Sequence, residues 1–184
     1  KVKWDNLDFI IVDMPPGTGD TQLTFAQEIK VDSAIKTFTQ KVNWNKLDFI
    51  IVDMPPGTGD TQLTFAQEIS LDGAIIISTP QEIALQDVKR GIKMFDKLKV
   101  NILGLVDNMS YFIGDDGKKY PIFGEGGVKK TAEEFGKEFL GEIPINSKVG
   151  KSGDSGKPIV EDIPDHEISK IYLDLAKKIK SIYL

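Results

Sequence analysis

The sequence predicts an α/β protein built on a doubly wound, mostly parallel sheet. Short apolar runs, rich in β-branched residues, alternate with longer segments in which apolar residues recur at helical spacing. Alternating strands and helices pair in parallel, because each helix carries the chain back to the same edge of the sheet. The runs that predict strands are residues 49–52, 71–78, 101–106 and 139–145. We expect residues 1–184 to form a single domain.

The N-terminal part of the chain is a tandem duplication, in which residues 1–40 repeat as residues 41–80. Within it, residues 7–29 are identical to residues 47–69. Two copies are too few for a stacked repeat fold, and the near-perfect identity indicates a recent duplication.

The strand at residues 49–52 consists of four consecutive apolar residues, which predict burial on both faces of the sheet. Asp53 follows directly, at the end of the strand where open α/β sheets bind their ligands. Residues 55–59, Pro-Pro-Gly-Thr-Gly, then predict a rigid turn. An acid in this place can hold the magnesium of a nucleotide through water, as in a Walker B strand. The alternative is that Asp53 caps a helix or forms a turn.

Helix signals follow the second copy. Thr79, Pro80 and Glu82 predict a helix start with a capping box and with proline at the first helical position. The core face of this helix is predicted to be Leu85, Val88, Ile92 and Phe95. Residues 131–135, with Gly136 behind them, predict a short helix. An apolar stripe predicts a C-terminal helix: Ile168, Ile171, Leu175, Ile179 and Ile182.

Composition excludes several classes of protein. The sequence has no cysteine, so it can form neither disulfides nor a thiolate metal site. The net charge of −5 argues against a nucleic-acid groove or an anionic membrane surface as the main partner, since both require a basic face. No apolar run approaches the roughly 20 residues of a membrane span, and no signal peptide is evident, so we expect a cytoplasmic protein. The start at Lys1, without methionine, suggests a fragment or a processed product.

Four motifs occur together along the chain: DMPPGTGD at residues 53–60, NMSYF at 108–112, IFGEGG at 122–127 and FLGEIPI at 139–145. From about residue 42 to the C-terminus, the sequence resembles the Mrp/ApbC family of iron–sulfur cluster carriers, which are P-loop ATPases of the MinD/ParA class. DMPPGTGD and NMSYF separate this family from its MinD and ParA relatives. The resemblance implies a sheet of P-loop NTPase type, ATP and magnesium as cofactors, and an iron–sulfur cluster that is carried to other proteins.

The resemblance places cofactor binding at Asp53, Gly57, Asn108 and Pro144. In the family, the asparagine at the position of Asn108 recognises the edge of adenine, to which an amide offers both a donor and an acceptor. Because Asn108 stands just beyond a strand predicted to end at residue 106, a turn-forming asparagine is the alternative. Pro144 resembles the position that flanks the base, and a proline that simply ends a strand is the alternative there.

Two features of the family are missing from this sequence. The phosphate-binding loop Gly-Lys-Gly-Gly-Val-Gly-Lys-Ser/Thr occurs nowhere, so we expect ATP to bind weakly and do not expect this chain alone to hydrolyse it. The C-x-x-C cluster ligands that many members carry after NMSYF are absent as well. Residues 113–120 stand in their place, and Asp115 with Asp116 predicts a polar hairpin turn.

Three other stretches look functional but have simpler explanations. Residues 124–127, Gly-Glu-Gly-Gly, could offer N–H groups to an anion, but Glu125 would repel it, and loop geometry is the better explanation. Residues 150–152, Gly-Lys-Ser, end like a P-loop but lack the glycine required five residues earlier. His166 lies at a predicted helix start, where we expect a solvated side chain.

The sequence therefore predicts an iron–sulfur cluster carrier or assembly protein of the Mrp/ApbC type. The expected partners are iron–sulfur apoproteins or assembly factors, together with a second copy in a homodimer, and neither nucleic acid nor membrane. The alternatives are a non-catalytic scaffold or a gene-decay fragment of the family. A MinD-type partition ATPase is less favoured by the motifs.

The first copy is expected to replace the missing P-loop strand. Residues 9–12 would pair in parallel with residues 49–52 through a right-handed helical crossover, in which Asp32 predicts an N-cap and residues 33–41 a helix. Asp13 would then lie near the lost phosphate site. Each apolar residue buried there would contribute roughly 1.5 to 3 kcal/mol; these residues are Ile10, Ile11 and Val12. The alternative is that the first copy stays disordered or pairs with a second molecule, because identical strands specify register poorly.

Overall fold

The structure is a computed structural model that describes residues 9–13, 49–54, 63, 66–67 and 71–183. The chain divides into two compact units, Lys1–Asp72 (unit 1) and Gly73–Leu184 (unit 2). The assignment of the whole chain to a single domain remains a prediction.

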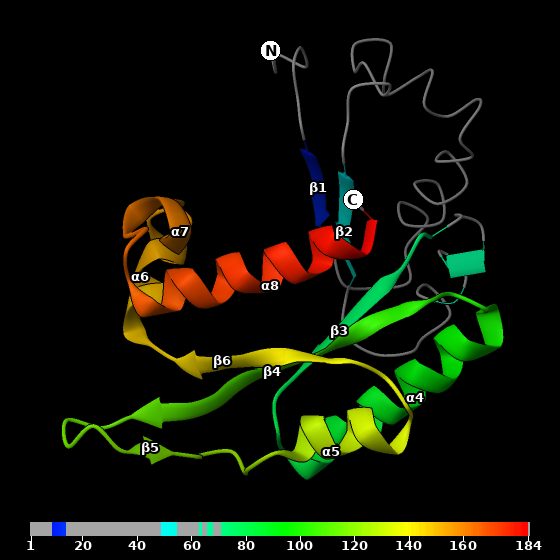
Figure 1. The fold of residues 1–184 in the computed structure, drawn as a ribbon, viewed down its shortest axis with the longest axis horizontal. Helices are drawn as coiled ribbons and strands as arrows, with labels where there is room; N and C mark the ends of the chain where they lie inside the picture. The colour runs from blue at the N-terminus through cyan, green and yellow to red at the C-terminus, as the bar shows by residue number, and fades with distance from the viewer. Residues whose placement is uncertain (1–8, 14–48, 55–62, 64–65, 68–70, 184) are drawn as a thin grey trace. The chain divides into compact units, whose positions relative to one another are not determined.

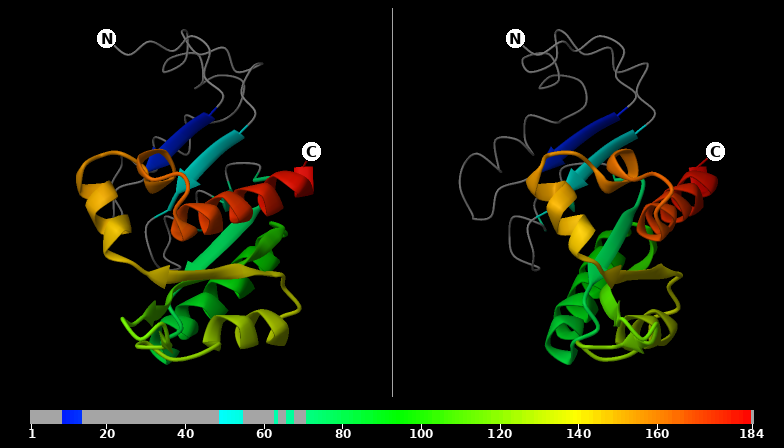
Figure 2. Two further views of the ribbon diagram at one scale, coloured as in Figure 1. Left: turned by 60° about the vertical axis from the view of Figure 1, so that its left-hand side comes forward. Right: turned by 90° about the vertical axis from the view of Figure 1, so that its left-hand side faces the viewer.

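The described strands of unit 1 are β1 (Phe9–Asp13) and β2 (Phe49–Asp53), one from each copy of the duplicated sequence. They form a parallel ladder in which every residue pairs with its own duplicate. Both views of Figure 2 show the two strands side by side. The predicted ladder is confirmed. The predicted crossover, with Asp32 and the helix at residues 33–41, lies outside the described residues.

The predicted burial of these strands is wrong for the side chains that the structure describes. Ile50 and Ile51 are 50% and 53% exposed, and Ile11 is 71% exposed. A run of apolar residues is buried on both faces only in a sheet that is covered on both faces. In the described part of unit 1, β1 and β2 pair only with each other, so neither strand has the two strand neighbours of a central position.

Unit 2 contains a four-stranded sheet around the long strand β4 (Ile102–Ile113). Two strands, β3 (Ala74–Ser78) and β6 (Phe139–Ile145), pair with β4 in parallel, one on each side. The short strand β5 (Lys119–Tyr120) pairs antiparallel with the end of β4. The prediction of a mostly parallel α/β sheet is confirmed, and β6 has the predicted bounds.

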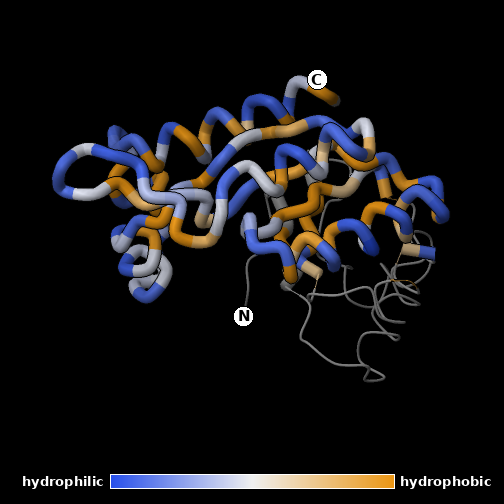
Figure 3. Tube along the Cα trace, turned by 90° about the horizontal axis from the view of Figure 1, so that it is seen from below, coloured by the Kyte–Doolittle hydropathy of each residue, from blue (hydrophilic) through white to orange (hydrophobic). Residues whose placement is uncertain are grey.

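Helices cover both faces of this sheet, as a doubly wound arrangement requires (Figure 1). On one face lie α4 (Glu82–Leu98) and α5 (Gly127–Glu134). The predicted C-terminal helix is α8 (Glu167–Tyr183), which packs on the other face against β6. Figure 3 shows hydrophobic and hydrophilic stretches alternating along α8, as expected of a helix with one face on a sheet. Two further helices, not predicted from the sequence, connect β6 to α8: α6 (Ser147–Asp154) and α7 (Ile159–Asp162).

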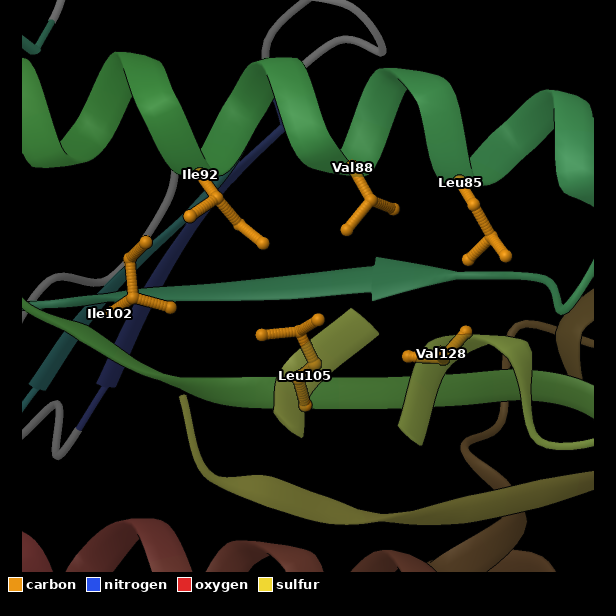
Figure 4. Close-up of a cluster of buried hydrophobic side chains, with 7 residues drawn as sticks. Leu85, Val88, Ile92, Ile102, Leu105 and Val128 are labelled. Carbon is orange, nitrogen blue, oxygen red and sulfur yellow. The ribbon is translucent and has the colours of Figure 1, made fainter. Parts of the chain in front are cut away.

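One hydrophobic core lies between α4, α5 and the sheet (Figure 4). The predicted core face of α4 is confirmed, since Leu85, Val88 and Ile92 are buried and point toward the strands. Ile92 and Leu105 are fully enclosed, and each such side chain contributes roughly 1.5 to 3 kcal/mol to folding. On the opposite face, Leu175 of α8 belongs to a second core.

The start of α4 differs from the prediction. The helix begins at Glu82, and Gln81 is an N-cap residue with extended backbone that makes no side-chain cap. The Thr79 hydroxyl instead donates to the side-chain oxygen of Gln81 at 3.3 Å, so the predicted capping box is wrong. The reason lies in the tertiary contacts of Pro80, which is buried with its carbonyl oxygen against Gly127 at the start of α5. The chain enters the helix only after this contact.

The strand predicted to end at residue 106 continues as β4 to Ile113. Asp107, Asn108 and Met109 therefore lie within the strand and not beyond it. The register with β6 shifts between Asn108 and Phe112, and Met109 has a φ of 57°. The strand continues through this irregular stretch of polar residues, because β4 stays paired with β6 and then with β5.

The starts of two other elements differ from the prediction. The strand predicted at residues 71–78 begins at Ala74, and its Ile77 is 61% exposed, because β3 pairs only with β4 among the described strands. The helix predicted at residues 131–135 is α5, which starts four residues earlier and is followed by Gly136 with a φ of 62°. The glycine stop of this helix is confirmed.

The polar hairpin turn predicted by Asp115 and Asp116 connects β4 to β5. The Asp116 carboxylate accepts hydrogen bonds from the backbone N–H of Lys118 at 3.0 Å and from the hydroxyl of Tyr120 at 2.8 Å. These donors, with the Lys118 N–H as the main cause, lower the pKa of Asp116. The turn thus has the hydrogen bonding that its sequence indicates.

Candidate functional site

Two of the predicted cofactor-binding residues lie on neighbouring strands. Asn108 of β4 pairs with Ile143 of β6, so Pro144 is the next residue along the adjacent strand. The Ser110 hydroxyl donates to the carbonyl oxygen of Ile143 at 3.2 Å and ties the two strands together here. Asn108 is half-buried and Pro144 is buried. Because Asn108 lies within β4, the alternative of a turn-forming asparagine is wrong.

A cavity of about 140 Å³ lies beside Pro144, where β6 ends and α8 begins. The residues that line it include Tyr111 and Phe112 from β4 and His166. Aromatic and proline surfaces with a few polar groups suit a flat heteroaromatic ligand. The volume would admit a single ring system but not a whole nucleotide, since ligand pockets of drug size are roughly 300 Å³ or more. Asn108 does not line this cavity.

His166 marks the start of α8, as predicted, but its side chain is not simply solvated. It is half-buried and lines the cavity. Its Nδ1 accepts a hydrogen bond from the backbone N–H of Ile168 at 3.2 Å. The imidazole therefore satisfies one of the free N–H groups of the first helical turn, which holds the ring against the protein.

Asp107 is a candidate that the sequence analysis did not single out. It is 1% exposed, and its Oδ1 has no hydrogen-bond partner in the part of the chain that the structure describes. It pairs with Ser78 of β3 on one side and with Glu142 of β6 on the other. Burial, and after it the charge of Glu142, raises the pKa of Asp107 from 3.8 to about 6. The signal was available, because Asp107 follows an apolar run in the sequence just as Asp53 does.

The other two predicted site residues belong to the duplicated segment. Asp53 ends β2 and is exposed. Gly57 lies outside the described residues. Asp53 belongs to unit 1, whereas Asn108 and Pro144 belong to unit 2, so the structure brings together only the latter two. The assignment of all four residues to cofactor binding remains a prediction.

The glycine-rich stretch at residues 124–127 fits the explanation by loop geometry. Gly124 and Gly126 have φ values of 110° and 65°, which favour glycine. A Cβ atom on Gly127 would lie 2.8 Å from the carbonyl oxygen of Pro80 and 2.7 Å from a methyl carbon of Leu85. These glycines therefore serve the close packing of α5 on the start of α4.

The Gly-Lys-Ser sequence at residues 150–152 lies inside α6. A P-loop places these residues where a loop enters a helix, so that free N–H groups meet the phosphates. Here Ser152 is buried, and its hydroxyl lies 3.5 Å from Asp162 of α7. The structure gives this stretch a role in packing α6 on α7.

The residues present do not fit an iron–sulfur cluster. The sequence has no cysteine, and thiolates are the usual ligands of such clusters. Within the described ranges, no three histidine, aspartate or glutamate side chains come together as a metal site. The P-loop that would hold the phosphates of a nucleotide is also absent from the sequence. Asn108 and Pro144, which the sequence analysis predicts to contact the base, lie on adjacent strands of unit 2.

Two stretches of the chain, residues 1–35 and 30–180, match the family model described as NUBPL iron-transfer P-loop NTPase. The iron–sulfur cluster carrier protein of Aquifex aeolicus is 43% identical over 181 residues, which cover 98% of this chain and 39% of that protein. The iron–sulfur cluster transfer protein NUBPL of Dictyostelium discoideum is 47% identical over 177 residues, which cover 96% of this chain and 42% of that protein. This chain thus spans about two fifths of the length of these curated relatives.

Two solved structures are similar to this chain. A nucleotide-binding protein from Archaeoglobus fulgidus, in complex with ADP, is 41% identical with a TM-score of 0.58, and the match covers 67% of this chain and 51% of that chain. The cell division ATPase MinD of Pyrococcus furiosus has a TM-score of 0.59 at 21% identity, over 81% and 56% of the two chains. The latter likeness shows the fold alone.

The sheet and its two helical layers are therefore of the P-loop NTPase class. Within that class, the chain belongs to the NUBPL iron-transfer family. This confirms the resemblance to the Mrp/ApbC carriers and disfavours the MinD-type alternative. Of the helices that the structure describes, none has the length and apolar character needed to cross a membrane.

Proposed function

We propose that this chain takes part in iron–sulfur cluster transfer and that unit 2 supplies the base-binding side of a nucleotide site. The observation that carries the proposal is the pairing of Asn108 with Ile143, which places Asn108 and Pro144 on adjacent strands, one register position apart. An amide can donate to and accept from the edge of adenine, and a proline can pack on the face of the base. The ADP in the solved relative from Archaeoglobus fulgidus supports an adenine nucleotide as the ligand.

Phosphate binding by this chain is expected to be weak. Asp53 is proposed to hold magnesium through water, and Gly57 to lie in the turn behind it. Neither replaces the N–H donors and lysines of a P-loop, which stabilise the charge of the phosphates. Base contacts alone would give dissociation constants in the roughly millimolar class. Hydrolysis of ATP is not part of this proposal.

Titration calorimetry with ATP and magnesium tests the nucleotide site. The parent chain should bind in the roughly millimolar range, and Asn108→Ala should weaken binding about fivefold to tenfold, the value of one hydrogen bond. The matched control is Asn101→Ala, an exposed asparagine just before β4, which should change affinity by less than about twofold. A dissociation constant below about 100 μM, or equal effects of the two variants, would contradict the proposal.

The iron–sulfur cluster is proposed as cargo whose thiolate ligands come from a partner. The partners would be iron–sulfur apoproteins or assembly factors, in the cytoplasm, with a second copy of the chain in a homodimer. Since the sequence has no cysteine, anaerobic reconstitution of the isolated chain should give no stoichiometric cluster absorbance. Adding a cysteine-containing partner should restore it. A stable cluster on the isolated chain would contradict this assignment.

A second candidate function is that of a non-catalytic scaffold. It is favoured by the joint absence of the P-loop and of the cluster cysteines from the sequence, while the sheet of unit 2 is complete with both helical layers. A scaffold would bind no nucleotide at any accessible concentration and would still bind its protein partner. The titration above therefore separates the two functions.

A further inference from the structure

The ladder of unit 1 shows which neighbour the duplicated strand accepts. β1 and β2 have the same sequence, and each residue of one pairs with the same residue of the other, in parallel and without a register shift. A ladder of identical parallel strands repeats its hydrogen-bond pattern from one strand to the next. A further strand of the same sequence can therefore add by the bonds that already join these two. Every other copy of the chain carries two such strands.

The side chains described in this ladder favour such an addition. Ile11 and Ile51 are register partners and are 71% and 53% exposed. Ile50 is 50% exposed and points to the opposite face, because successive side chains of a strand alternate. Exposed apolar surface is thus present on both faces of the ladder. An added strand would place another isoleucine beside each of these side chains and would remove part of their apolar surface from water.

Among the described residues of β1 and β2, little protects the edges of the ladder against further pairing. Among the strands that the structure describes, β1 and β2 pair only with each other, so each has an outer edge that no described strand covers. Natural sheets protect such edges with charged residues, proline or bulges. The paired segment Phe-Ile-Ile-Val-Asp carries a charge only at its last residue and contains no proline.

We propose that the β1–β2 ladder binds a second copy of this chain, with β1 of one copy beside β2 of the other, in parallel and in register. The two edges that meet are different, so the contact is head-to-tail and leaves a free edge at each end. Further copies can add to these ends. The occupant is a second copy because the ladder itself is built from two copies of one strand. The contact needs neither nucleotide nor cluster, so it is independent of the proposed nucleotide site and of cluster transfer.

Disulfide trapping tests the register. The parent chain has no cysteine, so Ile11→Cys and Ile51→Cys each carry a single thiol and cannot cross-link within one chain. Neighbouring strands lie about 4.8 Å apart, which is within the range that a disulfide spans. Mixing the two variants under mild oxidation should give a mixed disulfide dimer. The matched control mixes Ile11→Cys with Ile50→Cys, whose thiols would lie on opposite faces, and should give at least about fivefold less.

Sedimentation of the full-length chain, from about 1 μM to about 1 mM, tests the assembly. The average mass should rise with concentration and pass beyond the dimer. Ile51→Lys should move this rise to about tenfold higher concentration or more, because it places a charge on the contact. Ile83→Lys makes the same charge change at a side chain of α4 that is 80% exposed. It should change the concentration at which the average mass rises by less than about twofold.

Each outcome decides the proposal. Register-specific cross-linking together with growth beyond the dimer supports it. A chain that stays monomeric overturns it, as does cross-linking that is equal in the two mixtures. A cross-linked dimer that never grows would show exchange of strands between two chains and would overturn the head-to-tail contact. Failure of nucleotide binding would leave all of these results unchanged, so the two proposals can fail separately.

Discussion

Replacing Asp107 by asparagine should stabilise the protein near neutral pH. Asp107 is buried, one of its oxygens has no partner among the described residues, and its pKa is raised from 3.8 to about 6. This difference of about two between the pKa of Asp107 in the folded and the unfolded chain corresponds to about 3 kcal/mol of unfolding free energy. Because the folded state holds the proton more tightly than the unfolded chain, this stability is present below about pH 4. It is lost as the pH rises through about 6.

The Asp107→Asn substitution keeps the shape of the side chain and removes its ionisation, so the variant should not lose this stability as the pH rises. The new amide brings donors that cost about 1 to 2 kcal/mol where they find no partner. We therefore expect a net gain of about 1 to 2 kcal/mol near pH 7.5. This advantage should shrink by about 2 kcal/mol by pH 4.5, where the parent side chain is protonated in the folded state.

Urea unfolding, followed by far-UV circular dichroism across this pH range, measures both quantities. The matched control is Asp115→Asn in the exposed hairpin, which removes the same charge and should change stability by less than about 0.5 kcal/mol at either pH. Glu142→Gln should reduce the pH dependence without abolishing it, because burial is the larger cause of the raised pKa. Parallel pH profiles for the parent and Asp107→Asn would refute the reasoning.

Two further predictions concern packing in unit 2, and urea unfolding tests both. Ile92→Ala should lower the free energy of unfolding by about 2 to 5 kcal/mol, because Ile92 is fully buried. Ile83→Ala, at a side chain of the same helix that is 80% exposed, should lower it by less than about 0.5 kcal/mol. Gly104→Ala should cost about 1 to 3 kcal/mol, because its Cβ would lie 2.6 Å from the side chain of Leu140. Gly91→Ala in α4 has no atom within 4 Å of the new Cβ and should instead stabilise by about 0.5 to 1 kcal/mol; equal signs for the two glycine changes would contradict this account.

The parts of the fold that the sequence predicts are those that depend on local pattern. The core face of α4 repeats at helical spacing; Leu85, Val88 and Ile92 are buried as expected, and Phe95 is partly buried against the same core. The strand at residues 139–145 is an apolar run between turn residues, and β6 has the same bounds. The turn at Asp115 and Asp116 depends on side chains that bond the adjacent backbone. In each case the sequence pattern that predicts the element lies within the element or a few residues of it.

The errors arise where distant contacts decide. The length of β4 beyond residue 106 depends on pairing with β6 and β5, which no local pattern shows. The start of α4 depends on the contact of Pro80 with Gly127. The burial of β2 depends on which layers cover it, and Ile50 and Ile51 are half exposed although their run is wholly apolar. Local pattern predicts that a strand forms more reliably than it predicts what surrounds it.

The same distinction applies to the candidate site. Asn108 and Pro144 were found through the motifs that carry them, and the ladder between β4 and β6 places them on adjacent strands. Asp107 was missed because a strand-terminal acid was considered only where a glycine-rich turn followed it. Its importance comes from burial and from Glu142 on the neighbouring strand. Both are properties of the folded chain.

The ladder of unit 1 also bears on how nucleotide would bind. Asp13 and Asp53 pair at the ends of β1 and β2, so two acidic residues occupy the same register level on neighbouring strands. The resemblance to P-loop ATPases implies that the strand beside the one ending in the Asp53-type acid would lead into a P-loop, whose lysine and N–H groups would bind the phosphates. Here that neighbouring strand leads into a second copy of the acidic motif. Two unit charges at about 4 Å interact by about 1 kcal/mol even in water, so an acid in place of a lysine opposes a triphosphate instead of attracting it. The duplication therefore supplies a strand that can pair with β2 without supplying the charge that phosphate binding requires.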